Sequence, residues 1–393
     1  MSGAAFSADR VTLTVNGARY TRWTEIAITR DLREITGKFR LRYQDAGRAA
    51  AALPANAPSP VPSPVLRRQA CTLAIDGETV LDGWIDHVSG RWEAKRVDAQ
   101  LAGRDRTGDL ADCAAAPNGP AEWRNAMLLQ VAQQVCAPFG IKVTAQTDLG
   151  GAFPRLAVAP PESVLTLLEK AARQRGVLVV SDGVGGLLLT TAGTQKAPAD
   201  LRVGANVVAA SYQFDDTRRH SDVFVKGQTE KAAGTRPPGP TTLNHSYSPA
   251  PWSPAANAPK VEAAGILISG HASDPDVTRW RPSVLLTRTQ SGGATAQQQA
   301  EWRVRVARGL SEELLYTVLD WRSGGRLWRP NTIVRVSDPY AGIDDEMLIS
   351  RVAMRIGPDG PNPNTPQTDI AVVGRTAYDR INQATPKRPL KQG

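Results

Sequence analysis

Short segments in which apolar and polar residues alternate recur near both ends of this chain and constrain its fold more than any other feature. Residues 11–15 alternate between apolar side chains and threonine before Asn16-Gly17, and residues 72–75 alternate before Asp76-Gly77. Alternation with period two indicates a strand with one buried face, and Asn-Gly or Asp-Gly favours a tight hairpin turn. The first hundred residues are therefore predicted to form antiparallel strands of a small barrel or sandwich.

The last part of the chain has the same character. Further segments rich in β-type residues are Trp23–Thr29, Val80–Val88, Arg91–Ala102, Leu314–Trp321, Thr332–Val336, Met347–Ile356 and Asp369–Gly374. Residues 207–227 also read as strands, whereas the proline-rich segments 53–64 and 236–260 are predicted to be loops, because proline lacks the N–H that a strand or helix interior needs. Two β-modules therefore flank the middle of the chain.

The middle carries helical periodicity. Helices are predicted at Arg124–Ala137 and Ser163–Arg175, with Gly176 where a C-terminal cap belongs, and a third at Ala294–Arg308. A hairpin follows the second helix and turns around Asp182-Gly183. After a small-residue linker at 114–120, this block is expected to be a compact α+β domain.

Length and composition point to an ordinary globular chain of several domains. The 393 residues, 41% hydrophobic and 22% charged, fit two to four domains. No run approaches the ~20 apolar residues that span a bilayer, and residues 1–10 lack the pattern of a secretory signal. We therefore expect no stable membrane insertion, and we expect the chain to be made and folded in a cytoplasm. Cys71, Cys113 and Cys136 have no C-x-x-C spacing and are expected to be free thiols.

The formal net charge of +9 is dispersed along the chain, and only the tail around residues 387–391 is a basic cluster. Dispersed charge favours a solvated surface over a stripe that binds nucleic acid. The nine tryptophans, among them Trp23, Trp84, Trp92 and Trp328, could stack bases, but we favour core and subunit-interface roles.

No catalytic, cofactor-binding or metal-ligating residue is predicted. The four histidines, His87, His220, His245 and His271, have no ligand spacing, and the acidic clusters at 215–216 and 344–346 fit solvated turns. The glycines at 183–186 lack the third glycine of a dinucleotide fingerprint and precede a strand.

Several motifs resemble one known family in order along the chain. Residues 103–113, GRDRTGDLADC, are similar to the signature that closes the first β-domain of baseplate hub proteins of Mu-like phages. Residues 163–182, SVLTLLEKAARQRGVLVVSD, resemble the helix and hairpin that follow it, and residues 83–86 and 348–352 match in kind and place. The chain departs from the family mainly in the proline-rich segments.

The resemblance implies a β-dominated α+β fold similar to the T4 hub and the head of type VI secretion spikes: two related β-barrel domains with an inserted α+β domain, in a trimeric ring. The implied domains are a first β-barrel domain at 1–116, completed by about 204–230; an α+β domain at 117–203; a Pro-rich loop and connector at 231–286; a helix and second β-barrel domain at 287–380; and a basic tail at 381–393.

By the same resemblance the chain is expected to be a structural part of a contractile tail in the virion, assembled in a host cytoplasm, and not an enzyme. Three copies would join the hexameric tail tube to the trimeric spike, contact other baseplate proteins, and form a channel through which DNA passes transiently. Two alternatives are a tail-associated lytic enzyme that uses the acidic clusters and a nucleic-acid-binding protein that uses the basic surface.

Overall fold

The structure, a computed structural model, describes residues 10–44, 65–93, 96–193, 195–229, 266–287, 296–359 and 361–378. It divides into two compact units. Unit 1 comprises Met1–Arg218 and Arg305–Gly393, and unit 2 comprises Arg219–Val304. The proline-rich segments 53–64 and 236–260 and the tail 381–393 lie outside the described residues.

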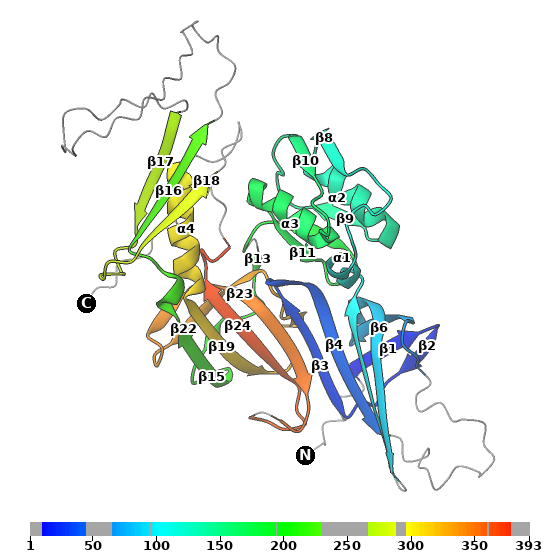
Figure 1. Cartoon of the computed structure of the whole chain (residues 1–393). Helices are drawn as coiled ribbons and strands as arrows, with labels where there is room; N and C mark the ends of the chain where they lie inside the picture. The colour runs from blue at the N-terminus through cyan, green and yellow to red at the C-terminus, as the bar shows by residue number, and fades with distance from the viewer. Residues whose placement is uncertain are drawn as a thin grey trace, which may run out of the picture. The chain divides into compact units, whose positions relative to one another are not determined.

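Unit 1 is built on one sheet of 14 strands. Along the main path the strands follow the order β15 (Val207–Phe214), β19 (Glu312–Leu319), β24 (Gln367–Gly374), β23 (Ile343–Ile356), β3 (Glu25–Asp31), β4 (Glu34–Gln44), β7 (Arg96–Asp105), β6 (Glu78–Glu93), β5 (Ala70–Ile75), β1 (Val11–Val15) and β2 (Ala18–Tyr20). Off this path, β22 (Thr332–Asp338) pairs with β23 and with the short strands β13 (Gln195–Lys196) and β14 (Leu201–Arg202). Figure 1 shows β3 and β4 beside β23 and β24.

The two predicted hairpin turns are confirmed. Asn16 and Gly17 have φ angles of 50° and 80°, Asp76 and Gly77 have 52° and 83°, and each pair joins antiparallel strands, β1 to β2 and β5 to β6. Positive φ at both central positions is the conformation that Asn-Gly and Asp-Gly adopt at low cost.

The expectation of two separate barrels is corrected by the structure. Strand β3 of the first module pairs with β23 of the second, from Arg351 opposite Asp31 to Ile356 opposite Ile26, so that both modules belong to one continuous sheet. No closed barrel is found among the described strands. Alternation in a sequence shows which face of a strand is buried, but it does not show which strand lies at each edge.

The expected completion of the first module by residues 204–230 is also wrong. Strand β15 pairs with β19 of the second module, and residues from Arg219 onward belong to unit 2. Both modules contribute to a single apolar core that includes Leu13, Leu73, Tyr316 and Trp321, all fully buried. The sheet and this shared core make unit 1 one body.

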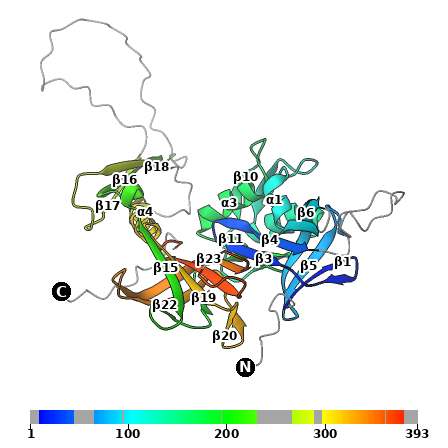
Figure 2. The same ribbon diagram turned by 90° about the horizontal axis from the view of Figure 1, so that it is seen from below.

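The inserted α+β part of unit 1 has its own core. Its elements are α1 (Gly108–Asp112), β8 (Glu122–Ala126), α2 (Leu128–Cys136), the 3-10 helix η4 (Ala137–Phe139), β9 (Val143–Ala145), β10 (Phe153–Ala157), α3 (Val164–Arg175), β11 (Leu178–Ser181) and β12 (Leu187–Thr190). β8 pairs with β10, and β11, β12 and β9 form a second small sheet. Figure 2 shows α1, α3 and β11 of the α+β part near β4 of the large sheet.

The second predicted helix is confirmed together with its C-terminal cap, and the structure adds an N-terminal cap. Ser163 Oγ accepts a hydrogen bond from Thr166 N, and Gly176 adopts a φ of 61° after the last turn. The helix expected to begin at Arg124 begins at Leu128 instead, because Glu122–Ala126 pairs with β10.

Unit 2 consists of a three-stranded sheet and a helix. The strands β17 (Ile266–Ser273), β16 (Asp222–Thr229) and β18 (Pro282–Thr287) lie in this order, and the start of α4 (Ala296–Leu310) packs on Val223 and Val225. The expected connector at 231–286 is therefore corrected, because residues 266–273 and 282–287 are strands. No helix in the described part of the chain is long and apolar enough to cross a membrane.

The remaining short elements are the 3-10 helix η5 (Asp216–Arg218) and the hairpin of β20 (Arg322–Ser323) and β21 (Arg326–Leu327).

Candidate functional site

The motif at residues 103–113 forms the joint between the large sheet and the α+β part. It runs from the end of β7 into α1, where β6 and β7 approach closely. A Cβ atom on Gly83 would lie 1.9 Å from Arg104 O, and one on Gly103 would lie 2.1 Å from Trp84 O. Only glycine fits at these two crossing points.

Asp105 is the buried centre of this joint. Its carboxylate, in a residue 1% exposed, accepts hydrogen bonds from Gly37 N at 2.9 Å, Ser181 Oγ at 2.7 Å and Thr107 N at 3.0 Å, and from Thr107 Oγ1. These donors come from β4, from β11 and from the turn before α1. Burial raises the pKa of Asp105, although the hydrogen bonds from Ser181 and Thr107 oppose that rise.

Arg30 forms a second link from the sheet to the α+β part. From β3, its Nη2 donates to Gly183 O at 2.7 Å and to Val80 O, and desolvation by burial lowers its pKa. The Asp182-Gly183 turn that the sequence predicts is therefore held by a buried guanidinium. Sequence reasoning identified the turn but not its partner, because nothing in a sequence relates Arg30 to a turn 153 residues away.

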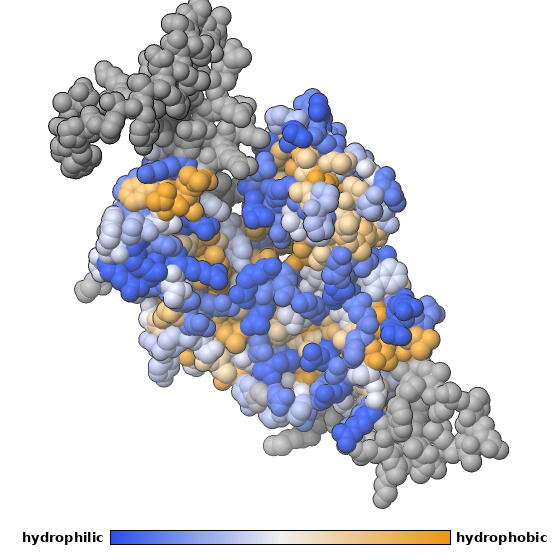
Figure 3. All heavy atoms as spheres, viewed as in Figure 1, coloured by the Kyte–Doolittle hydropathy of each residue, from blue (hydrophilic) through white to orange (hydrophobic). Residues whose placement is uncertain are grey.

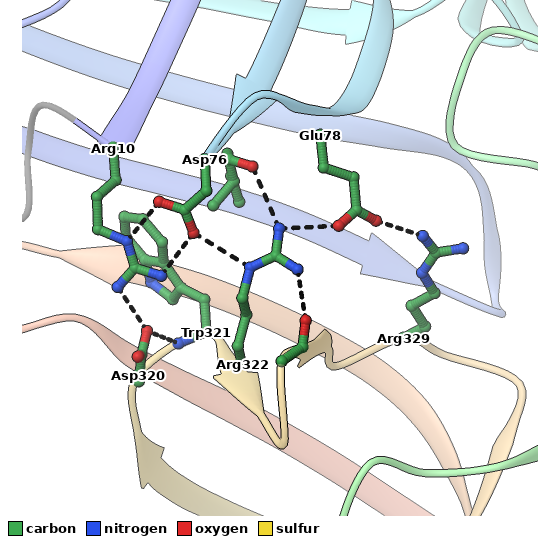
Figure 4. A network of polar contacts seen from close by, with 9 residues as sticks. Arg10, Asp76, Glu78, Asp320, Trp321, Arg322 and Arg329 are labelled. Carbon is green, nitrogen blue, oxygen red and sulfur yellow. Dashed lines mark hydrogen bonds and ion pairs between the residues drawn. The ribbon is translucent and has the colours of Figure 1, made fainter.

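A third polar cluster, the interface network, joins the two β-modules and is shown in Figure 4. The Arg10 guanidinium binds Asp76 in a bidentate manner, at 2.8 and 2.7 Å, and donates to Asp320 Oδ1 at 2.7 Å. It also lies over the Trp321 ring, 5.1 Å from the centroid. Arg10 and Asp76 border the first module, whereas Asp320 and Trp321 follow β19 in the second.

The other half of the interface network is centred on Arg322, whose side chain is 18% exposed. It donates to Asp76 Oδ2 at 3.1 Å and to Glu78 Oε2 at 2.8 Å, and Arg329 Nη2 donates to Glu78 Oε1 at 2.7 Å. Hydrogen bonds from Arg10 lower the pKa of Asp76. The pKa of Glu78 is also lowered: burial raises it, but the hydrogen bonds and charges of Arg322 and Arg329 together outweigh burial. A network of this kind fixes orientation more than a single surface pair.

The acidic cluster at 344–346 does not converge on one point. Asp344 binds Arg335 at 3.0 Å, while Glu346 binds Arg375 at 2.7 Å. Asp344 and Glu346 therefore face cations from different elements, and Asp345 accepts a hydrogen bond from Glu346 N. Among the described residues there is no group of three or more His, Cys, Asp and Glu side chains that could hold a metal ion.

In unit 2, His271 lies beside Asp222 and Ser273, and the sequence analysis did not identify this group of three polar side chains. Its Nε2 lies 2.8 Å from Asp222 Oδ1, and Ser273 Oγ donates to the same oxygen at 3.0 Å. A nucleophilic triad needs histidine between serine and carboxylate, with one ring nitrogen toward each. Here one nitrogen faces both, because β16 and β17 place Asp222 directly opposite Ser273.

The cysteines are free, as predicted. Cys71 and Cys136 are buried, and burial raises the pKa of each to about 12, while Cys113 is half-buried with a raised pKa. Of the tryptophans named from the sequence, Trp23 and Trp328 lie in the core. Trp84 lies beneath the Arg106 guanidinium, 5.7 Å from the ring centroid. These positions give no support to base stacking.

Replacing Asp105 by alanine should lower the free energy of unfolding by about 3 kcal/mol, because several buried donors would lose their acceptor. Asp112→Ala is the matched control in the same motif: Asp112 binds Arg104 at the surface, and its loss should cost below about 1 kcal/mol. Urea denaturation measures both. Equal losses for the two variants would contradict the role of Asp105.

The interface network should weaken in acid. Because the pKa of Asp76 is lowered in the folded state, its contribution is complete above about pH 4 and is lost as the pH falls through the folded value. Asp76→Asn should lose on the order of 1 kcal/mol at pH 7 and show a flatter decline of stability below pH 4. Thermal unfolding of both proteins from pH 2 to 7 tests this prediction. If stability falls with pH equally in the wild type and in Asp76→Asn, Asp76 does not contribute to the acid sensitivity.

Family models match three parts of the chain. Residues 10–105 match the N-terminal domain of the Mu phage baseplate assembly protein GpP-like family, residues 107–191 match the second domain of the baseplate hub protein gp44-like family, and residues 292–369 match the fourth domain of GpP. The boundary between the first two matches falls at Asp105 and Thr107, within the joint described above.

Whole-chain comparisons agree. The chain is 30% identical to baseplate hub protein gp44 of Escherichia phage Mu over 88% of this chain and 84% of that protein. The 43 kDa tail protein of prophage MuSo2 from Shewanella oneidensis is 30% identical, with a TM-score of 0.74 over 94% of this chain and 99% of that one.

A tail protein from Neisseria meningitidis, at 20% identity over 94% of this chain and 98% of that one, shares the fold with a TM-score of 0.72. The predicted resemblance is confirmed: the chain belongs to the family of baseplate hub proteins of Mu-like phage tails.

Proposed function

We propose that three copies of this chain form the ring that joins the tail tube to the central spike and that DNA passes through its channel. Two facts support the ring: membership of the hub family and the presence of two β-modules side by side in one sheet. Three chains with two modules each can meet a sixfold tube on one side and a threefold spike on the other, and closed rings satisfy identical interfaces. The role is structural and needs no catalytic residue.

The observation that carries the channel proposal is the polar face of the central strands. On β4, exposed Lys38, Arg40 and Arg42 alternate with buried Phe39 and Leu41. This face bears two shallow hollows of about 580 and 470 Å³, lined mainly by residues of β3, β4, β6 and β7, among them both polar and apolar side chains. The view in Figure 3 shows unit 1 largely hydrophilic where these strands lie, with smaller hydrophobic areas.

Three cations on the polar face are paired with carboxylates of the same face. Arg42 binds Glu25 at 2.7 Å, Lys38 binds Glu34, and Arg104 binds Asp86 at 2.8 Å. A passage for DNA works best when it does not grip the phosphates, because each cation that neutralises a phosphate adds affinity and slows transit. Pairing of these three cations within the sheet weakens their grip on phosphates, and it favours a channel lining over a site of stable DNA binding.

Release of these cations should create DNA affinity. The double variant Glu25→Gln, Glu34→Gln frees Arg42 and Lys38, so the slope of log K against log salt for duplex DNA should steepen by about 0.9 for each cation. The wild-type chain should bind duplex weakly at physiological salt. Fluorescence anisotropy over a salt series measures both.

The control for that titration is Asp200→Asn with Glu122→Gln, which changes net charge equally away from the polar face, at the partners of Arg202 and of Arg124 and Arg155. An equal effect of the control would show that net charge alone matters. Submicromolar, salt-sensitive binding by the wild type would overturn the passive channel and favour the nucleic-acid-binding alternative.

The hub role itself is tested in the particle. Cells that make the tail without this chain should yield no sheathed tails in electron micrographs, because tube and spike lack their junction, and the chain supplied in trans should restore them. Normal tails without the chain would refute the hub. Clearing of cell wall in a zymogram, abolished by alanine at residues 344–346, would instead support the lytic alternative.

A further inference from the structure

Strand β15 forms one end of the large sheet and has none of the features that protect an edge strand. Its sequence, VVAASYQF, contains no charge, proline or glycine, although Tyr212 is 56% and Phe214 50% exposed. Their rings lie 5.3 Å apart. Apart from an isolated bridge between Val203 and Val207, its only strand partner in the described part of the chain is β19. Such an edge is a template for another strand.

A second open edge lies on β6. Residues 78–84 of this strand pair with β5 on one side, but from His87 to Glu93 only β7 is paired, and no described strand covers the other side. The open half of β6 and the eight-residue β15 are of similar length. Within the described part of the chain, one sheet thus carries two different open edges.

The pairing of β23 with β3 within one chain shows how the edge of β15 could pair with the edge of β6. Strand β23 is long like β6, has a register shift in its middle, pairs through residues 343–348 with β22, and through residues 351–356 with β3. Strand β6 has the same plan: a shift between Ile85 and His87, β5 on its first half, and an open second half. No described strand occupies the corresponding place on β6.

Strand direction agrees with this comparison. From β15 to β6 the path β15–β19–β24–β23–β3–β4–β7–β6 contains only antiparallel pairs. These eight strands are an even number, so β15 and β6 run in opposite directions, and β15 of one copy can pair antiparallel with β6 of the next. Two unlike edges give a head-to-tail contact, which closes into a ring when the rotation permits.

We infer that β15 pairs with the open half of β6 in a second copy of this chain, repeating the β23–β3 contact between subunits. This inference rests on the proposed ring and names the surface that builds it. The aromatic pair Tyr212–Phe214 is buried in the contact, and the polar faces of neighbouring copies become continuous.

The peptide groups of β15 show where to block the contact. Asp215 N donates to Ser311 O at 2.9 Å, so Asp215 faces β19, and residues alternate in a strand. The N–H groups of Ala210, Tyr212 and Phe214 therefore point to the open edge. A proline at 210 removes one outward N–H, and proline is tolerated at such edge positions.

In light scattering of the full chain, the wild type should be a trimer, whereas Ala210→Pro and Tyr212→Lys should dissociate at least about 30-fold more readily, with unchanged circular dichroism. Tyr340→Lys is the matched control, since Tyr340 is 84% exposed outside β15, and it should remain trimeric.

Cross-linking locates the contact independently of folding effects. If β15 lies on β6 as β3 lies on β23, Asp215 lies opposite His87 and Gln213 lies opposite Ser89, so that Gln213 and Ser89 share a face. In a Cys113→Ser background, Gln213→Cys with Ser89→Cys should give covalent trimers with a short bismaleimide, and neither single cysteine should.

The outcomes separate the two proposals. A trimeric wild type whose edge variants stay trimeric and do not cross-link would overturn the β15–β6 contact and leave the trimeric hub intact. A wild type that is monomeric at every concentration, without cross-links, would overturn the ring as well.

Discussion

The pairing of β23 with β3 is the constraint on which the rest of unit 1 depends. It joins two modules that are more than 300 residues apart in sequence, and it lets Leu13 and Tyr316 share one apolar core. Burial of apolar area is the main source of stability, and a single shared core buries more than two small ones. The interface network of Figure 4 reinforces the same junction at its border, where Arg10 and Arg322 connect carboxylates of both modules.

The α+β part depends on a smaller set of contacts. Asp105 and Arg30 reach it from the sheet, and both act on backbone or hydroxyl groups whose positions are fixed by β4, β11 and the turn at Gly183. Because these groups are buried, each contact is directional and costly to break. The joint therefore sets the orientation of a part that has its own separate core.

Local features of the sequence predicted local structure well. Asn16-Gly17, Asp76-Gly77 and Gly176 each act through their own backbone angles, so a reading of neighbouring residues was sufficient. The pairing of β3 with β23, the position of β15 and the strands of unit 2 depend on contacts between distant residues, which alternation cannot specify. At the joint, the motif itself was recognised, but the partners of Asp105 come from Gly37 and Ser181, far away in the chain.

The burial of the cysteines has a chemical consequence for a protein of the virion. Thiols are oxidised as thiolates, and a pKa of about 12 leaves on the order of one thiolate in 10⁵ at neutral pH for Cys71 and Cys136. Outside the cell no reducing system repairs oxidised side chains. The packing that excludes water from these two sulfur atoms therefore also slows their oxidation, because it keeps them in the less reactive thiol form.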